Sequence, residues 1–455
     1  MQKSKLLPRK RDSAMAEQFK IQNFRKRHPR FIYQKYFYKI KKGDLKISFV
    51  FKIEPDIQFR PKIIIKDINQ SQISQIGEGV LNNLIFHLGL IEILSYWKAT
   101  CSSKIVIEAG YLNKEQIKWW KDLIINGMGQ FFYENKINWT RPNFLKISGG
   151  QGKPDNKRFG EKLKNRYLVP FAGGRDSIVT LERLKKPIFA KASAGKQKKE
   201  IALFLVNPSK QIQKTVRVAG IKKQIIVKRE IDTRLLKLNK KGYLNGHTPF
   251  TALLSFLTVF CAILFDYKHI VFSNEKSADE GNVKYLGRII NHQWAKSSEF
   301  EKMFKDYCKK YLARDINYFS FLRTYTELEI SKMFTKYPEY FPVFSSCNAG
   351  MKIGAKQIRW CGNCPKCLFA YLTLYPFLDK KQLLKIFGKD LFKNKELLPT
   401  MRALIGEGKT KPFECVGTYQ ESKKAFELSL KKALGRSPMG EAKKSGKIPY
   451  LLGKI

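Results

Sequence analysis

The stretch LVPFAGGRDSIVTLE, residues 168–182, joins a short apolar run to a helical pattern through two consecutive glycines. Gly173 and Gly174 can adopt backbone conformations that other residues avoid, so the chain can approach a ligand closely at this turn. The helix is expected to begin near Asp176, and the N–H groups at a helix N-terminus attract anions. A neighbouring cation and a hydroxyl donor would strengthen such a contact. The stretch therefore predicts a phosphate-binding turn formed by Ala172, Gly173, Gly174, Arg175, Asp176 and Ser177.

This turn fits neither of the two most familiar nucleotide-binding patterns. It lacks the lysine of G-x-x-x-x-G-K-[ST] and the spacing of G-x-G-x-x-G. It resembles the S-G-G-x-D-S pyrophosphate loop of the ATP-pyrophosphatases, which split ATP into AMP and pyrophosphate to adenylate a substrate. Ala172 stands where that loop has its first serine, and the other four defined positions match. The alternative is an ordinary strand-to-helix turn that binds no ligand.

Short apolar runs alternate with helical segments after residue 160. The runs cover 168–172, 201–207, 224–231 and 269–275, with a fifth candidate at 340–347. Continuous apolar strands that alternate with helices indicate an α/β fold whose parallel sheet is covered on both faces. Ligands bind beyond the carboxyl ends of the strands in such sheets, which is where the glycine turn falls.

The chain of 455 residues is long enough for two or three domains. Strands of period two between residues 31 and 66 predict a small antiparallel sheet, and the polar stretch SGGQGKPDNKR has the composition of a linker. The polar segment 185–200 is expected to be a solvated insertion. We expect a flexible leader at 1–20, an N-terminal α+β domain at 21–150, an ATP-pyrophosphatase-like (HUP-like) α/β core at 160–346, and a helical C-terminal region with a cysteine cluster at 347–455.

The chain is strongly basic. It has 87 Lys and Arg against 38 Asp and Glu, a formal net charge of +49. Such an excess is typical of proteins that bind nucleic acid, but an anionic small-molecule substrate would also account for it. The basic residues are spread along the whole chain, with no basic tail and no recognisable nucleic-acid module. Nucleic acid is therefore not an expected partner.

The sequence predicts a cytoplasmic protein with no membrane partner. No apolar segment of the kind found in a secretory signal follows the basic residues at the start of the chain. The longest apolar run, residues 250–265, is short for a membrane span and is followed by Asp266 and Lys268. We expect this run to form a buried helix.

Three cysteines lie in the seven residues CGNCPKC, and a fourth lies upstream in SSCN. Four thiolates with this spacing suit a tetrahedral zinc ion with no open coordination position, which makes the site structural rather than catalytic. The predicted ligands are Cys347, Cys361, Cys364 and Cys367. An iron–sulfur cluster, or a set of buried free thiols, is the alternative. Some ATP-pyrophosphatase relatives, notably the 7-cyano-7-deazaguanine synthases, carry a similar zinc cluster.

Candidates for proton transfer lie in three other strings. VFSNEKSADEGN places Glu275, Asp279 and Glu280 after a predicted strand, where carboxylates can bind Mg²⁺ or carry protons. His247 precedes the long apolar helix, and His292 lies in NHQWAKSSEFE. Each of these residues also has a structural interpretation, as a solvated loop acid, a helix cap or a hydrogen-bonded histidine.

These strings together resemble one family. NGHTPFTA, FSNEKSADEGN, NHQWAKSSEFE, SSCN, RWCGNCPKC and KPFECVG occur in the order found in the ATP-dependent glutamate epimerases that act on UDP-N-acetylmuramoyl-L-alanyl-L-glutamate. The resemblance runs from about residue 24 to about residue 417. It implies an enzyme of peptidoglycan precursor synthesis that uses ATP and Mg²⁺, binds a UDP-muramoyl dipeptide, and inverts its terminal glutamate.

The resemblance also implies a chemical route. Esterifying a glutamate carboxylate with AMP removes its negative charge and makes the α-proton more acidic. A base then removes that proton, reprotonation on the other face inverts the centre, and hydrolysis releases AMP. The candidate catalytic residues are Asp176, His247, Glu275, Asp279, Glu280 and His292. Two other functions stay open: an adenylating enzyme that amidates a carboxylate or modifies tRNA, and a zinc-stabilised nucleic-acid-binding protein.

Overall fold

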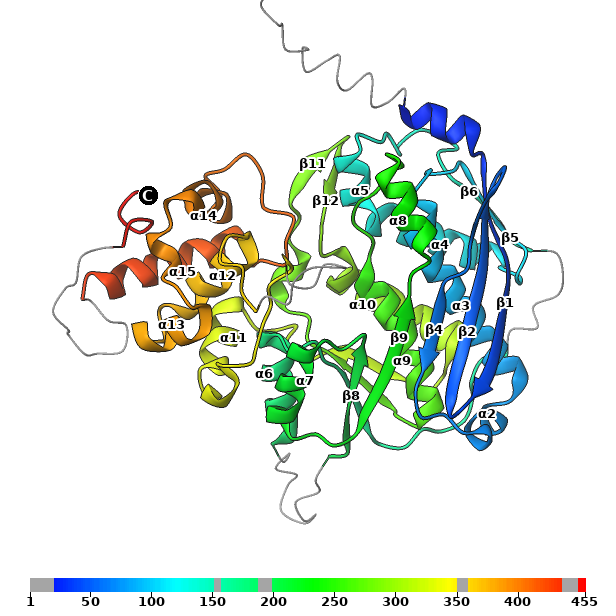
Figure 1. The fold of residues 1–455 in the computed structure, drawn as a ribbon, viewed down its shortest axis with the longest axis horizontal. Coiled ribbons are helices and arrows are strands. Elements are labelled where there is room, and N and C mark those ends of the chain that lie inside the picture. The colour runs from blue at the N-terminus through cyan, green and yellow to red at the C-terminus, as the bar shows by residue number, and fades with distance from the viewer. Residues whose placement is uncertain (1–19, 151–156, 187–198, 350–358, 436–448) are drawn as a thin grey trace, which may run out of the picture.

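The computed structural model describes residues 20–150, 157–186, 199–349, 359–435 and 449–455. The predicted leader at 1–20, apart from its last residue, and most of the predicted insertion at 185–200 lie outside the described residues. The described chain is a mixed α/β structure with a large, mostly parallel sheet and a helical C-terminal region (Figure 1).

One sheet of eleven strands extends through the sheet-containing part of the molecule. Its order is β13-β10-β7-β8-β9-β4-β2-β1-β5-β6, and β3 pairs with β2 beside this path. The strands are β1 Arg30–Lys41, β2 Asp44–Ile53, β3 Ile57–Phe59, β4 Lys62–Ile65, β5 Lys104–Ile107, β6 Lys146–Ser148, β7 Tyr167–Pro170, β8 Ile201–Val206, β9 Gln224–Glu230, β10 His269–Phe272 and β13 Asn317–Ser320. A separate hairpin joins β11 (Val283–Tyr285) to β12 (Arg288–Ile290).

The half of the sheet that contains the glycine turn is parallel and doubly wound. The chain goes outward from β7 through β8 to β9, then returns to the other side of β7 with β10 and β13. The order therefore reverses between β7 and β10. Open α/β sheets bind ligands at such a switch point, beyond the carboxyl ends of the strands.

Alternate residues of these strands enter two different hydrophobic cores. Leu168 of β7 and Phe204 of β8 contribute to the core that contains α3 (Glu78–Trp97) and α9 (Phe250–Phe265). Their neighbours Val169 and Leu203 contribute to the core on the opposite face, with α6 (Arg175–Lys185) and the C-terminal helices. Burial on both faces explains why these strands are continuously apolar.

The fifth strand of the parallel half is not the one that the sequence predicts. The predicted run at 340–347 begins at the end of a 3₁₀ turn, Pro338–Tyr340, and continues as turns and irregular chain. Pro342 has no N–H to give to a ladder, and serines follow it. The position is filled by β13, whose four residues NYFS pair with β10. Cys347 consequently does not follow a strand.

The predicted antiparallel sheet between residues 31 and 66 is present as β1 to β4. The helical chain that follows the antiparallel strands is divided at Gly77, which has a φ of 80°, into α2 (Gln70–Ile76) and α3. Residues 114–134 form two further helices, α4 (Lys114–Gly127) and α5 (Gly129–Glu134).

The sheet continues without a break from the N-terminal strands into the parallel half. β4 pairs with β9 in antiparallel register over four residue pairs, Lys62–Glu230 to Ile65–Val227. A buried ion pair lies beside this junction: Arg229 of β9 donates to both carboxylate oxygens of Glu92 on α3, at 2.8 and 2.9 Å. The side chain of Glu92 is fully buried. The junction therefore combines a backbone ladder with a paired internal charge.

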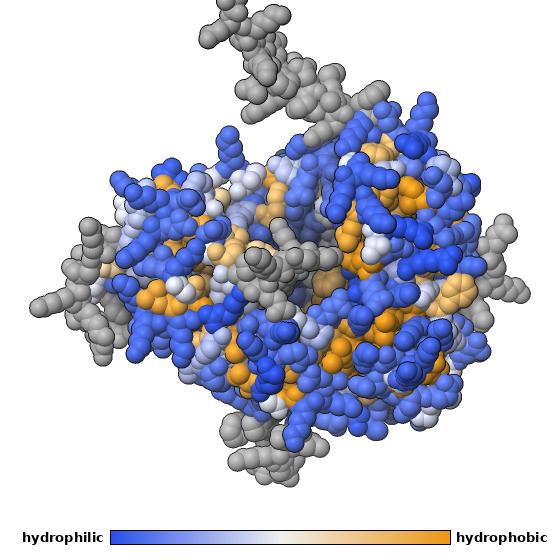
Figure 2. Space-filling view, viewed as in Figure 1, coloured by the Kyte–Doolittle hydropathy of each residue, from blue (hydrophilic) through white to orange (hydrophobic). Residues whose placement is uncertain are grey.

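Two apolar helices lie inside the molecule. α3 is long and apolar enough to cross a membrane by length and composition, but 83% of its apolar window is buried within the structure. α9 covers the run 250–265 and is buried along most of its length, as predicted. On the face shown in Figure 2, hydrophilic side chains predominate and apolar ones form small separate groups.

The C-terminal region is helical, as predicted. A second core joins these helices to α6 (Arg175–Lys185) and α7 (Lys210–Ala219). The helices of this region and the one that precedes it are α11 Glu327–Phe334, α12 Pro365–Leu374, α13 Lys380–Phe387, α14 Leu398–Leu404 and α15 Tyr419–Ala433.

Replacement of Arg229 by leucine should destabilise the fold strongly, because it leaves the buried carboxylate of Glu92 without its partner. We expect the free energy of unfolding, measured by urea denaturation, to fall by about 3–5 kcal/mol. Lys228→Leu is the matched control: it removes a neighbouring exposed pair with Glu230 and should cost less than about 1 kcal/mol. Equal losses in the two variants would contradict this interpretation.

Candidate functional site

A pocket of about 250 Å³ lies over the carboxyl ends of β7, β8 and β10. Four of the six residues of the predicted phosphate-binding turn line it: Ala172, Gly174, Asp176 and Ser177. Further lining residues that the argument uses are Asn274, which follows β10, and Lys296. The pocket therefore coincides with the switch point of the sheet.

The glycine turn has the conformation that an anion site needs. Gly173 has a φ of 71°, and a Cβ at this position would lie 3.0 Å from Oγ1 of Thr215. Gly174 is the N-cap of α6 and has no side chain to accept hydrogen bonds from the first turn of the helix. The N–H groups at this helix end are thus available to an anion in the pocket.

Arg175 points away from the pocket. Its side chain is 5% exposed and forms ion pairs with Asp176, at 2.8 Å, and with Glu327 of α11. It also donates to the hydroxyls of Ser331 and Thr373, at 2.8 and 3.2 Å. Arg175 therefore joins the glycine turn to α11 and α12.

Asp176 is the acidic side chain of the turn that faces the pocket. Burial favours its protonated form, but the charges of Arg175 and Lys366 outweigh burial and lower the pKa of the carboxyl group. It is therefore an anion at neutral pH and is suited to share a divalent cation with a phosphate.

Glu275 lies in the same group of buried charges and is 2% exposed. Burial raises the pKa of its carboxyl group to about 7, although Lys296 acts in the opposite direction. A carboxyl group with this pKa exchanges protons near neutral pH, which suits general acid–base chemistry.

The two predicted histidines lie side by side, with ring centroids 4.6 Å apart. Burial lowers the pKa of His247 to about 3, and the charges of His292 and Lys98 act in the same direction, so His247 is neutral. The Nδ1 atom of His292 lies 2.5 Å from Oε1 of Gln130 on α5.

The structure gives Asp279 and Glu280 other partners. Asp279 is exposed, and its carboxylate accepts from the N–H of Ser298 at the start of α10 (Ser298–Tyr307) at 2.7 Å. Glu280 pairs with Lys411 at 2.9 Å and accepts from the N–H of Tyr419 at 3.0 Å. Neither carboxylate lines the pocket beside the glycine turn.

Three side chains near this site were not predicted from the sequence as site residues: Lys296, Lys366 and Cys415. Lys296, from the string NHQWAKSSEFE, lines the pocket and lies 3.3 Å from the Sγ atom of Cys415. Lys366 donates to the backbone carbonyl of Cys415. Cys415 lies in KPFECVG, one of the strings shared with the epimerase family. No cysteine or histidine lies near it in the sequence, so no local pattern indicated a role for its thiol.

The four predicted cysteine ligands converge. The Sγ atoms of Cys347, Cys361, Cys364 and Cys367 all lie within 4.8 Å of one another. The Cys361–Cys367 and Cys364–Cys367 separations are 3.6 and 3.4 Å. Zinc–sulfur bonds of 2.3 Å in a tetrahedron place the sulfurs about 3.8 Å apart, so this donor set fits a four-thiolate metal centre.

This cluster lies next to the glycine turn. The N–H of Ser345, two residues before Cys347, donates to the carbonyl of Gly173 at 3.1 Å. Cys364 is the N-cap of α12, the helix that carries Lys366. A metal held here would fix both segments against the site.

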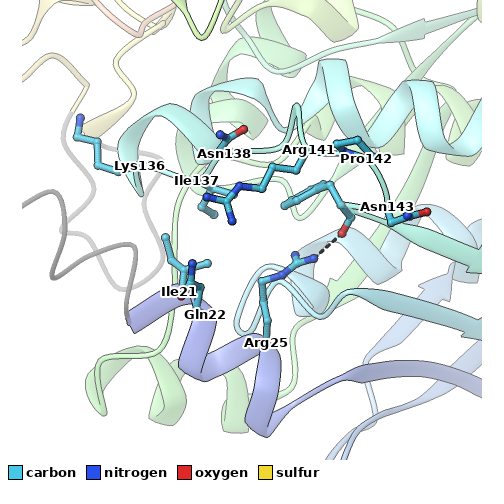
Figure 3. Close-up of a pocket in the computed structure, with 10 residues that line it drawn as sticks. Ile21, Gln22, Arg25, Lys136, Ile137, Asn138, Arg141, Pro142 and Asn143 are labelled. Carbon is cyan, nitrogen blue, oxygen red and sulfur yellow. Dashed lines mark hydrogen bonds between the residues drawn. The ribbon is translucent and has the colours of Figure 1, made fainter.

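A second pocket, of about 200 Å³, lies between the helix that ends at residue 27 and the segment 136–144 (Figure 3). Its lining includes three cations, Arg25, Lys136 and Arg141. Arg25 already donates to the backbone carbonyls of Cys101 and Phe144. The contacts of Arg25 are therefore structural.

Comparison with known proteins shows the family of this chain. The family model described as the MurL N-terminal domain matches residues 22–321, and the MurL C-terminal domain matches residues 343–437. The chain belongs to the MurL family. The N-terminal MurL domain ends just after β13, and the C-terminal one contains all four clustered cysteines.

Three MurL relatives are named UDP-N-acetyl-alpha-D-muramoyl-L-alanyl-L-glutamate epimerase. The relative from Micromonospora sp. is 33% identical over 348 residues, which cover 76% of this chain and 75% of the relative. Those from Salinispora tropica and Xanthomonas oryzae pv. oryzae are also 33% identical, over 76% of this chain and 73% and 74% of their own lengths. The names support an epimerase activity for this MurL protein.

Cys364→Ser should remove the bound metal and lower the melting temperature, because three thiolates leave the metal site open. Metal content per chain and thermal unfolding measure the two effects. Cys308→Ser, at a buried thiol in the other core, should keep the metal. Retention of a full metal complement by Cys364→Ser would contradict the four-cysteine site.

Proposed function

We propose that this protein epimerises the terminal L-glutamate of UDP-N-acetylmuramoyl-L-alanyl-L-glutamate to D-glutamate, with ATP cleaved to AMP and pyrophosphate. The observation that carries this proposal is the pocket formed by the glycine turn and Asp176 at the switch point. The strand order β9-β8-β7-β10-β13 is the doubly wound order of nucleotide-binding sheets and supports an ATP-pyrophosphatase-like core. The names of the relatives supply the substrate and the outcome.

Adenylation solves the chemical problem of this reaction. The α-proton of a glutamate is poorly acidic beside a carboxylate, because its removal adds charge to an existing anion. An acyl adenylate carries no charge on that carboxyl group, so its carbonyl oxygen can accept the electron pair. Hydrolysis of the adenylate after inversion releases AMP and leaves the D-epimer.

The residues of the turn have distinct roles in this proposal. The N–H groups at the start of α6, with Gly173, Gly174 and Ser177, bind the departing pyrophosphate. Asp176 binds the Mg²⁺ that neutralises the phosphates. Ala172 lines the pocket with a methyl group where the related loops have a serine. Arg175 acts indirectly, because it holds Asp176 and the helices behind the turn.

The candidates for proton transfer differ in their surroundings. Glu275, His247 and His292 lie in or beside the group of buried charges, and their placement supports a direct role. Asp279 and Glu280 carry helix and loop contacts, so we propose a supporting role for them.

The remaining assignments follow from the cysteines. We propose a structural zinc ion at Cys347, Cys361, Cys364 and Cys367, because a closed thiolate site leaves no open coordination position. We also propose a cytoplasmic location, since the eight cysteines, all within the described residues, form no disulfide, as is typical of a reducing compartment.

The direct test combines the purified protein, ATP, Mg²⁺ and the UDP-muramoyl dipeptide, followed by determination of the glutamate configuration. The proposal expects pyrophosphate, AMP and D-glutamate in the product. Release of AMP without D-glutamate would retain the adenylating core and reject epimerisation. An absence of nucleotide cleavage in the presence of the substrate would reject the proposal as a whole.

Asp176→Asn should lower pyrophosphate release by about 100-fold or more, because the amide cannot bind Mg²⁺ as a carboxylate does and the phosphate charge stays uncompensated. Initial rates at saturating ATP measure the change, and circular dichroism checks the fold. Asp122→Asn, at an exposed position of α4, is the control and should keep the wild-type rate. Undiminished release in Asp176→Asn would exclude Asp176 from the site.

A further inference from the structure

Cys415 lies in the loop between α14 and α15, and this loop is fixed against the other half of the molecule. Lys411 forms its ion pair with Glu280 at 2.9 Å, and Asn282 donates to the carbonyl of Pro412 at 2.8 Å. Figure 1 shows the loop leaving α14 and passing towards the β11–β12 hairpin. Gln293 also donates to the carbonyl of Val416 at 3.3 Å, so contacts on both sides of Cys415 determine its position.

Basic side chains surround the thiol of Cys415. Nζ of Lys296 lies 3.3 Å from its Sγ atom, and Nε2 of His292 lies 3.9 Å from it. Lys366 of α12 binds its carbonyl, while the acidic neighbour, Glu414, accepts from Asn348. Burial would raise the pKa of this thiol, but Lys296, His292 and Lys366 outweigh burial and lower it to about 5.

His292 has a fixed orientation towards Cys415. Nε2 of Gln130 donates to Glu134 at 2.7 Å, which turns the Oε1 atom of Gln130 towards His292. That oxygen accepts from Nδ1 of His292 at 2.5 Å, so Nδ1 carries a proton and Nε2 faces the sulfur. A histidine held in this way can exchange a proton with the thiol.

Cys415 also lies close to the pocket that is predicted to bind the nucleotide. Lys296 connects the two places, because its side chain lines the pocket beside the glycine turn and contacts the sulfur. Cys415 itself is partly exposed, in contrast to Cys101, Cys261 and Cys308, which are buried. Lys296 therefore puts the thiol within one side chain's length of the pocket in which the carboxyl group would be activated.

We propose that Cys415 is a catalytic residue that transfers the α-proton on one face of the activated glutamate, with His292 as its proton partner. This inference rests on the proposed function. It assigns a role that the sequence strings left to carboxylates and histidines. It also explains why a thiol with cationic neighbours lies beside an adenylation pocket.

The proposed step moves one proton from Cα to sulfur and one electron pair from Cα to oxygen. The Cα–H bond breaks, an S–H bond forms, and the electron pair moves onto the carbonyl oxygen of the acyl adenylate. The ammonium of Lys296 stabilises the negative charge that has moved from sulfur to oxygen. The thiol then passes its proton to Nε2 of His292. The electron pair then returns from the carbonyl oxygen to Cα, which takes a proton from water on the opposite face. The hydroxide that remains is neutralised by the proton that His292 releases, so the configuration is inverted and no net proton is gained or lost.

The test separates adenylation from proton transfer in Cys415→Ser. Pyrophosphate release in a single turnover should persist, while D-glutamate formation should fall about 100-fold or more, the contribution expected of a general base. When the reaction is run in D₂O, the Cys415→Ser variant should no longer exchange the α-proton of one epimer of the substrate for deuterium. It should still exchange the α-proton of the other epimer. Cys261→Ala, at a buried thiol of α9, is the control and should keep both activities.

Two results would overturn the inference. One is D-glutamate formation at the wild-type rate in Cys415→Ser; the other is parallel loss of pyrophosphate release and D-glutamate in a variant with wild-type circular dichroism. If the wild-type protein itself releases no pyrophosphate, the proposed adenylating function is wrong, and this result is distinct from a failure of the role given to Cys415.

A second measurement uses the unmodified enzyme, in case the variant does not fold. Alkylation by iodoacetamide, followed by mass spectrometry of each cysteine peptide, should give Cys415 a pH midpoint near 5, and Lys296→Met should raise that midpoint. Cys101 and Cys308 are internal references, since burial raises their pKa to about 12. A midpoint near 8.5 for Cys415, the value of an unperturbed thiol, would contradict its role.

Discussion

The buried guanidinium of Arg175 is the contact on which the site depends. It pairs with Asp176 in the glycine turn and with Glu327 on α11, and it reaches Thr373 on α12. An arginine can make these contacts simultaneously because its planar group presents five donors in fixed directions. Removal of either carboxylate would leave Arg175 paired with the other alone and would remove one of the contacts that join these segments. The turn and the helical region are thus held in one arrangement, which brings the cysteine cluster and Lys366 to the pocket.

The positive charges inside this site have a consistent purpose. Lys296 and Lys366 face the carboxylates of Asp176 and Glu275 and the thiol of Cys415. Without them, burial would favour the protonated form of each of these groups. A small part of the net charge of +49 therefore keeps Asp176 and Cys415 ionised and limits the rise in the pKa of Glu275. An anionic substrate would meet the same field.

Those features that depend on neighbours along the chain could be predicted from the sequence. The glycine turn, the strands around it and the three clustered cysteines are all local patterns. Features that depend on distant segments could not. Gln130, His292 and Cys415 meet only because α5, the loop after β12 and the loop before α15 converge. The substitution of β13 for the predicted strand at 340–347 has a related cause, since four residues without an apolar run carry little local signal.

The ladder between β4 and β9 has a mechanical consequence. It makes the N-terminal strands and the parallel half one rigid sheet. A hinge there would have to break the backbone hydrogen bonds between β4 and β9 and expose the buried side chain of Glu92. Any opening that admits a bulky substrate must then occur elsewhere. The loop that carries Cys415 crosses the seam, the boundary between the part of the molecule that contains this sheet and the C-terminal helices. Motion at that seam would separate the thiol of Cys415 from His292 and Lys296, so the groups that we propose for proton transfer would meet only in the closed enzyme.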